Sequence, residues 1–285
     1  MVDSAPSELL SLHSRWNAAG QPQPPTRWMP RQWLRRMPER ADYLQSLPNP
    51  ITRSDVAAQF VGADQSEETA VRAFLAAMVW GYGRIGYGAY RTMGVLAGTE
   101  RADARLLETL QVARSSGGMA GFEYMARNRL KGLGVAFGTK YLYFCMAGTD
   151  AETLPPAPIL DSVVCDWLAV HDGWRPQIGY WKPRDYNRYC ERVRDWAIEL
   201  EQPQGTVEYL MFAGGIGIAN QWGGLGTPAG TDSQGVPNSG VDAVLDALAE
   251  AVVVFEALSP SNEDLDAFRR GVRALEQLAD TQAVQ

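Results

Sequence analysis

A short glycine hairpin between two apolar helical segments is the feature of this sequence that most restricts its fold. Residues 125–130 are expected to end one helix, GLG at 132–134 turns the chain, and a second helix begins near Ala136 or Gly138. Glycines let the backbone turn tightly and approach another molecule closely. The start of a helix offers free N–H groups and the positive end of its dipole, which suit a phosphate. The segment therefore predicts either an ordinary turn between packed helices or a phosphate-binding turn.

Helical periodicity extends over most of the remaining chain. Ser66 is expected to cap a helix that ends at the glycine cluster beginning at Gly81. Residues 141–144 (YLYF) are favoured as helix over strand, and 214–239 as a glycine-rich loop with one short helical piece. The other expected helices cover residues 7–18, 30–46, 54–60, 102–114, 119–130, 161–171, 183–201, 206–213, 240–258 and 261–278. Because no strand–helix–strand alternation is present, the sequence predicts an all-α fold.

Charge is unevenly distributed along the 285 residues. The net charge of −7 argues against a nucleic-acid binder, but much of the acidity lies in 241–285. Residues 27–53 instead carry six arginines, at positions 27, 31, 35, 36, 40 and 53, which could form a basic face. We therefore expect an N-terminal helical segment with a basic stretch at 1–65 and a catalytic region with C-terminal helices at 66–285, or one compact domain overall.

Several classes of protein are disfavoured by composition. No apolar run approaches the roughly 20 residues that span a bilayer, and the N-terminus lacks the features of a secretory signal. The three cysteines are widely spaced, which favours buried reduced thiols in a cytoplasm and no zinc or iron–sulfur site. With only two histidines, a histidine-rich metal site is also disfavoured. We expect a cytoplasmic protein with no metal, no membrane association and no obligate protein partner.

The glycines at 81, 83 and 86 match the dinucleotide-binding pattern GxGxxG. That pattern requires a preceding strand, whereas a helix is expected here, so we set the dinucleotide interpretation aside. Two interpretations remain. The glycines could end a helix and form tight turns, or the interleaved Trp80, Tyr82, Tyr87, Tyr90, Arg84 and Arg91 could stack on a base and touch phosphate.

Lys140 and Asp161 are the candidate reactive residues. Lys140 lies near the start of an apolar helix, where the helix dipole and apolar neighbours should lower its pKa and make the amine a usable nucleophile. The alternative is an ordinary exposed lysine whose stem covers apolar surface. Asp161 follows a proline-rich apolar loop and precedes an amphipathic helix, so it is expected near the N-cap as an ionised carboxylate. Its alternative role is a plain helix cap.

The order of elements over 120–168 is specific: a helix, the GLG hairpin, a helix led by Gly138-Thr139-Lys140, a proline loop, and an apolar–Asp–helix segment. It resembles the helix-hairpin-helix DNA glycosylase superfamily, and most closely the 8-oxoguanine DNA glycosylase branch with its archaeal-type and bacterial OGG-fold relatives. WGYG at 80–83 is also similar to the bacterial relatives, and the iron–sulfur cysteines of the endonuclease III branch are absent. In the eukaryotic enzymes the lysine follows the hairpin almost directly. The hairpin pair here is therefore either Gly132 with Gly134 or a pair that includes Gly138.

This resemblance implies a two-lobed helical architecture and a bifunctional DNA glycosylase and AP lyase of bacterial base excision repair. Lys140 would attack C1′ of an extruded nucleotide through a Schiff base, and Asp161, which lies 21 residues later, would assist. Gly132, Gly134 and Thr139 would bind a phosphate of double-stranded DNA. No cofactor is implied beyond a monovalent cation at the hairpin.

The identity of the base is less constrained. Trp80, Tyr82, Gln221 and Trp222 are the candidates for the base pocket, with burial in the core as the alternative for Trp222. The resemblance implies a damaged purine such as 8-oxoguanine, and a phage-modified base excised in defence is an alternative. Two further hypotheses are a non-catalytic DNA-binding protein that keeps the hairpin and a helical enzyme acting on another class of substrate.

Overall fold

The structure of the chain is a computed structural model that describes residues 4–147, 149, 154–222, 268, 270 and 271. The expected helices at 240–258 and 261–278, and most of the acidic C-terminal segment, lie outside this part of the chain. The described residues form α-helices, two 3-10 turns and a single antiparallel bridge between Thr26 and Ile51. The predicted all-α fold is therefore confirmed.

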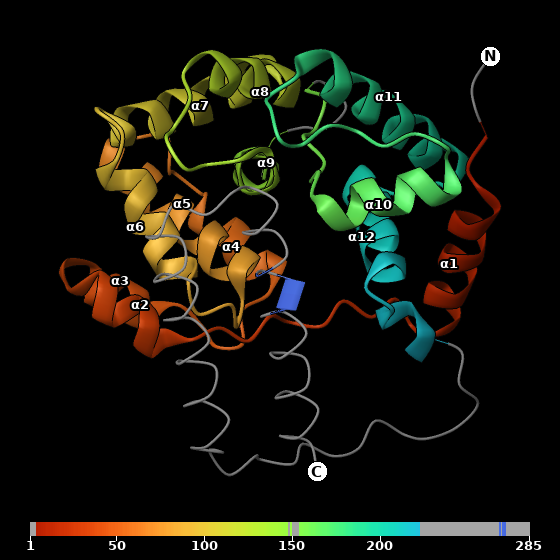
Figure 1. Cartoon of the computed structure of the whole chain (residues 1–285), viewed down its shortest axis with the longest axis horizontal. Helices are drawn as coiled ribbons and strands as arrows, with labels where there is room; N and C mark the ends of the chain where they lie inside the picture. Colours follow the sequence, from red (N-terminus) through yellow and green to blue (C-terminus); the bar gives the residue numbers. More distant parts are fainter. Residues whose placement is uncertain (1–3, 148, 150–153, 223–267, 269, 272–285) are drawn as a thin grey trace, which may run out of the picture.

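The helices are arranged in two groups around α9 (Val135–Cys145), as Figure 1 shows. One group comprises α2 (Pro30–Arg36), α3 (Ala41–Ser46), α4 (Arg53–Gln59), α5 (Glu67–Tyr82), α6 (Gly88–Ala97), α7 (Ala102–Ser116) and α8 (Gly118–Arg127). The other comprises α1 (Ser7–Ala18), α10 (Ser162–His171), α11 (Pro183–Glu199) and α12 (Gln204–Gly215). Contacts of α8 with both α9 and α11 join the two groups. This arrangement places Thr139 and Lys140 of α9 beside the start of α10.

The helix starts follow the expected local chemistry with two exceptions. Ser66 caps α5 in a capping box with Thr69, as expected. The expected helix at 30–46 is instead divided into α2, a 3-10 turn at Pro38–Arg40, and α3, because a proline cannot donate the hydrogen bond that continues a helix. The sequence interpretation also missed α6, whose glycines at 88 and 94 and aromatic residues resembled a loop.

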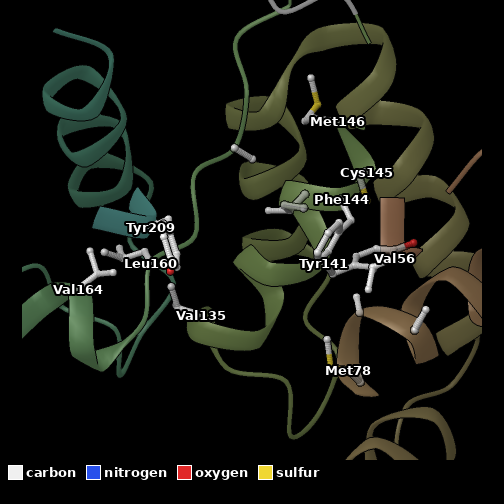
Figure 2. Close-up of a cluster of buried hydrophobic side chains, with 14 of the residues drawn as sticks. Val56, Met78, Val135, Tyr141, Phe144, Cys145, Met146, Leu160, Val164 and Tyr209 are labelled. Atoms are coloured by element: carbon white, nitrogen blue, oxygen red, sulfur yellow. The ribbon is translucent and has the colours of Figure 1, made fainter. Parts of the chain in front are cut away.

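Residues of both helix groups contribute to one apolar core. Figure 2 shows Tyr141 and Phe144 of α9 packed toward Val56 of α4, while Leu160 and Val164 lie on the other side with Tyr209 of α12. The ring of Tyr141 meets those of Phe60 and Phe74, and its hydroxyl donates to the carbonyl of Leu106. Helix α9 is thus fixed on several sides, which holds its polar residues at defined positions.

None of the helices in the described part of the chain combines the length and the apolar character that crossing a bilayer requires. Cys145 and Cys165 are buried and Cys190 is partly buried, and all three are free thiols. Burial raises the pKa of all three thiols, which disfavours the thiolate form. These cysteines therefore behave as small packing residues, as their spacing suggested.

Candidate active site

The hairpin consists of the residues between α8 and α9. Leu133 donates its N–H to the carbonyl of Leu130 at 3.1 Å, and Gly132 adopts a φ of +84°, a combination that forms a tight turn. Gly134 is the N-cap of α9 and has no side chain to satisfy the first N–H groups of that helix. Gly132 and Gly134 are both exposed. Within the described residues, therefore, no side chain caps the positive end of α9.

Gly138 is not part of this turn. It lies inside α9, which begins at Val135 rather than at 136 or 138, and a Cβ at position 138 would overlap the ring of Trp181. The glycine therefore serves close packing against Trp181, which in turn contacts Phe122 of α8. The structure resolves the alternatives that the sequence left open, and Gly132 and Gly134 form the hairpin.

The loop before α10 is held against α9 by buried hydrogen bonds. The hydroxyls of Tyr186 and Tyr189 on α11 donate to the carbonyls of Pro158 and Ile159 at 2.9 Å and 2.6 Å. The hydroxyl of Thr139 accepts the N–H of Leu160 at 3.0 Å. Each of these bonds pairs a buried backbone group that would otherwise lack a hydrogen-bond partner. Together they fix the position of the residue that follows Leu160.

Thr139 was expected to bind a DNA phosphate, and its surroundings contradict this. Its side chain is fully buried, and its hydroxyl also lies within hydrogen-bond distance of the carbonyls of Ala136 and Leu160. A hydroxyl enclosed in this way cannot reach a ligand at the surface. Thr139 instead fastens α9 to the loop that carries Asp161.

This fastening can be tested by removing the hydroxyl. Thr139→Val keeps the shape of the side chain but leaves the N–H of Leu160 buried without a partner, which should lower the free energy of unfolding by about 1–3 kcal/mol. Urea denaturation followed by circular dichroism measures the change. Thr139→Ser keeps the hydroxyl and should recover most of the loss. Equal stability of the valine and serine variants would show that the hydrogen bond contributes little.

Lys140 and Asp161 meet in the interior between α9 and α10. The Nζ of Lys140 donates to Oδ2 of Asp161 at 2.8 Å, and each residue is only 8% exposed. Asp161 is also the N-cap of α10, because its Oδ1 accepts the N–H of Val164 at 3.1 Å. The helix cap expected at Asp161 is therefore present, and the same carboxylate contacts Lys140, while its catalytic role stays a prediction. Lys140 lies in the second turn of α9, and the alternative of an exposed lysine is wrong.

The pKa of Asp161 is lowered in spite of its burial. Burial alone would raise this pKa, but the charge of Lys140 and the hydrogen bonds from Lys140 and from the N–H groups of Val164 and Val163 outweigh it. The carboxyl group therefore stays ionised beside the lysine. The arrangement combines a buried amine with a carboxylate in direct contact, as nucleophilic catalysis by an amine requires.

The glycine cluster after Trp80 makes room for Lys140. A Cβ at Gly81 would lie 2.8 Å from Cδ of Lys140 and 3.2 Å from the ring of Phe137. The Nζ of Lys140 lies 5.3 Å from the centre of the Phe137 ring, and this ring stacks on Tyr82 at 3.8 Å. Gly81 lies in the last turn of α5 and Gly83 is the C-cap of that helix, so a helix precedes the turn and the dinucleotide interpretation finds no support. The sequence interpretation missed that Gly81 borders the lysine.

The four base-pocket candidates do not gather around the Lys140–Asp161 pair. Tyr82 is buried under Phe137, next to the pair, but Trp80 packs edge-on against Phe144. Gln221 is exposed in a 3-10 turn (Ile218–Gln221), and Trp222 is 5% exposed and contacts Tyr209. Trp222 is thus buried in the core, the alternative that the sequence left open. The aromatic candidates do not form one pocket.

A second buried ion pair was not anticipated from the sequence. Arg53 of α4 and Glu208 of α12 approach to 2.9 Å, and Glu208 is 1% exposed. Burial raises the pKa of Glu208, Arg53 lowers it, and nearby Asp161 raises it further. The one indication in the sequence was an acid inside the apolar run VEYLMFA. Arg53 was expected on a basic face, whereas its guanidinium pairs with Glu208 in the interior.

The rest of the basic stretch remains near the surface. Arg27, Arg31 and Arg35 are exposed, and Arg36 lies over the ring of Tyr90 at 5.6 Å. Arg40 pairs with Glu68. The helix α2 that carries three of these arginines packs against α6, which follows the glycine cluster. A cationic surface therefore adjoins the α5–α6 connection, although it lacks Arg53. Among the described residues, no group of histidine, cysteine and acidic side chains could hold a metal ion.

The comparisons with known proteins agree with this geometry. No curated protein and no solved structure matches the chain at a significant level. A family model described as "Putative 8-oxoguanine DNA glycosylase OGG-like protein" matches residues 19–212. That range is well over half of the chain and includes the hairpin, the Lys140–Asp161 pair and the Arg53–Glu208 pair. It leaves out Gln221 and Trp222. The protein belongs to this OGG-like family of DNA glycosylases, as its hairpin and its order of helices indicated.

Proposed function

We propose that the protein is a bifunctional DNA glycosylase and AP lyase that excises an oxidised purine, with 8-oxoguanine as the expected substrate. The observation that carries this proposal is the buried contact of 2.8 Å between Nζ of Lys140 and the carboxylate of Asp161. A structural role alone gives little reason to bury this pair, because desolvation of two charges offsets most of the attraction between them. A reactive amine beside a proton acceptor gives such a pair a chemical use.

The reaction begins after the nucleotide leaves the stack, since the glycosidic bond is otherwise out of reach. The lone pair of the Lys140 amine forms a bond to C1′ while the bond from C1′ to the base breaks, and the electron pair leaves with the base. Asp161 stabilises the positive charge that develops on the sugar and, once the new bond has formed, accepts a proton from the positively charged nitrogen. Opening of the sugar ring moves a proton to the ring oxygen and gives a Schiff base. Transfer of a C2′ proton to water then expels the 3′ phosphate.

The hairpin has the features of an anchor for the DNA backbone. Gly132 and Gly134 are exposed, and no side chain caps the start of α9, the positive end of that helix. We propose that they bind a phosphate flanking the extruded nucleotide, with a monovalent cation bridging the hairpin and the phosphate. The arginines of α2 add positive charge on an otherwise acidic protein.

Trapping by sodium borohydride tests the proposal directly. Purified protein is incubated with a labelled duplex that contains either 8-oxoguanine or an abasic site, and borohydride reduces any Schiff base to a stable covalent adduct. We expect an adduct on both duplexes, seen as a shifted band after denaturing electrophoresis. Base release without any adduct would refute the lyase part of the proposal and support a glycosylase alone. Absence of both on a panel of oxidised and modified bases would refute the proposal.

The same panel separates the alternative substrates. Adducts on a phage-type modified base but not on 8-oxoguanine would assign the enzyme to defence. The burial of Lys140 gives no support to a non-catalytic hairpin protein, for which an exposed lysine was expected. We therefore retain excision as the function.

A further inference from the structure

The connection between α10 and α11 and the first turns of α11 carry a group of exposed basic and aromatic side chains. Residues 173–188 contain four cations and one acid, in a chain whose net charge is −7. Tyr180 is 66% exposed, and Lys182, Arg184 and Arg188 are exposed as well. We call these four residues the α11 basic surface. A local excess of positive charge on an acidic protein indicates an anionic partner.

The cations of this surface lie where the electrostatics of a helix disfavour them. Lys182 is the N-cap of α11 and Arg184 lies in its first turn, at the positive end of the helix dipole. Arg184 and Arg188 are four residues apart on the same face, so their charges repel each other. Arg188 lies over the ring of Trp174 at 4.3 Å. These placements cost the folded chain free energy, which an external anion would recover.

The other two arginines of α11 are neutralised inside the protein. Arg192 pairs with Asp172 at 2.7 Å, and Arg194 pairs with Asp195 at 3.0 Å. Across the described residues, no acidic side chain lies within ion-pair distance of the three cations of the α11 basic surface. The helix therefore has two paired arginines in its second half and a cationic, unpaired beginning.

The α11 basic surface begins one helical turn from the hairpin. Trp181, which directly precedes Lys182, packs so closely on α9 that a Cβ at Gly138 would lie 2.2 Å from its ring. The N–H of Gly138 donates to the carbonyl of Gly134, the N-cap of α9, so the two glycines are about 6 Å apart along the helix axis. Trp181 also meets Phe122 of α8 at 5.0 Å, and α8 contacts α11 (Figure 1). The start of α11 is thus fixed beside the hairpin.

We propose that the α11 basic surface binds the DNA backbone next to the phosphate that the hairpin holds. Phosphates follow one another at about 3.4 Å of rise along each strand, so a strand anchored at the hairpin brings several charges to its surroundings. Lysine, arginine and tyrosine side chains are common donors to phosphate oxygens. Lys182, Arg184 and Arg188 supply the charge, and the hydroxyl of Tyr180 supplies a neutral donor. The inference rests on the proposed function for the DNA at the hairpin, and it assigns this surface to affinity rather than to chemistry.

The salt dependence of binding tests this surface. A labelled duplex with a tetrahydrofuran abasic analogue is titrated by fluorescence anisotropy between about 50 mM and about 200 mM NaCl. Each phosphate contact of a cation contributes about 0.9 to the slope of log K against log salt concentration. The double variant Lys182→Gln with Arg184→Gln should bind about ten-fold or more weakly at the lowest salt, and its slope should be smaller by about 2. Lys182→Arg with Arg184→Lys keeps both charges and should retain the wild-type slope.

Two arginines of the same helix give a matched comparison. Arg184→Gln and Arg194→Gln each remove one exposed arginine from α11. The first should lower the salt slope by about 1, and the second should leave it unchanged. Tyr180→Phe should weaken binding by about two- to five-fold with an unchanged slope, because the hydroxyl carries no charge. Arg184→Gln should melt at the wild-type temperature or above it, since the cation opposes the helix dipole.

Shortened duplexes locate the contact. Two duplexes end about four base pairs from the analogue, one on each side of it. One of them should remove the difference in affinity between wild type and the double variant, because the strand no longer reaches the α11 basic surface. The other should preserve the difference.

The inference and the proposed function fail on different results. Wild-type affinity and slope in the double variant, or a difference that both shortened duplexes preserve, would overturn the surface and leave the proposed function intact. A lower melting temperature of Arg184→Gln with wild-type binding would assign that cation to the fold instead. Wild-type enzyme that binds DNA without forming an adduct would refute the lyase, while weaker binding by the double variant would still support the surface. Absence of DNA binding by the wild-type enzyme would overturn both.

Discussion

Replacement of Lys140 by glutamine is expected to abolish the borohydride adduct on both 8-oxoguanine and abasic-site DNA. Glutamine keeps a polar group of similar reach beside Asp161 but has no lone pair on nitrogen that can attack C1′. The loss should exceed about a thousand-fold, because a Schiff base requires a primary amine. Denaturing electrophoresis of the trapped product measures it. Binding to abasic-site DNA, measured by fluorescence anisotropy, should stay within about ten-fold of wild type.

Lys131 provides the matched control for this change. It is the other lysine of the hairpin region and it is exposed, and its backbone N–H donates to the hydroxyl of Thr99. Lys131→Gln should weaken binding by the small amount expected for one surface charge and should leave trapping unchanged at saturating enzyme. An adduct that persists in Lys140→Gln and disappears in Lys131→Gln would move the nucleophile to the hairpin turn and refute the assignment.

Local rules placed Lys140 near the start of a helix and Asp161 before the next one, and the resemblance to helix-hairpin-helix glycosylases paired them. Periodicity assigned helices before and after the loop, and the position of Asp161 before an apolar helix indicated a cap. The glycines of the hairpin indicated the turn between α8 and α9. What local rules could not give was the contact itself, which depends on tyrosines of α11 that hold the loop from 28 and 30 residues away.

The errors have the same origin in distant contacts. Thr139 looks like a hydroxyl at the start of a phosphate-binding helix, and only the position of Leu160 shows that it is enclosed. Arg53 belongs to an arginine-rich stretch, and its partner Glu208 lies far along the chain on α12. The role of Gly81 was missed because Lys140, whose side chain it borders, is distant in sequence. A single sequence carries no direct record of such pairs. The division of the chain at residue 65 stays a prediction.

Asp161→Asn is expected to separate the chemical role of the carboxylate from its structural role. Asparagine caps helices about as well as aspartate, so the bond from Val164 to the side chain should survive. The charge that would stabilise the sugar cation and accept the amine proton is lost. Single-turnover excision of 8-oxoguanine should therefore fall by about 10²–10⁴-fold. Trapping at an abasic site should fall much less, because no glycosidic bond has to break there.

The dependence of stability on pH gives an independent measure of the same carboxylate. The folded-state pKa of Asp161 lies below the ordinary value of 3.8, so its ionised form contributes stability above pH 3.8 that is lost as the pH falls through the folded pKa. The difference in unfolding free energy between wild type and Asp161→Asn should be constant near neutral pH and shrink below about pH 4. Asp166→Asn, on the same helix but exposed and paired with Arg175, should lack the loss of excision. Wild-type excision by Asp161→Asn would show that the carboxylate serves α10 and the buried ion pair alone, and that Lys140 loses its proton to another acceptor.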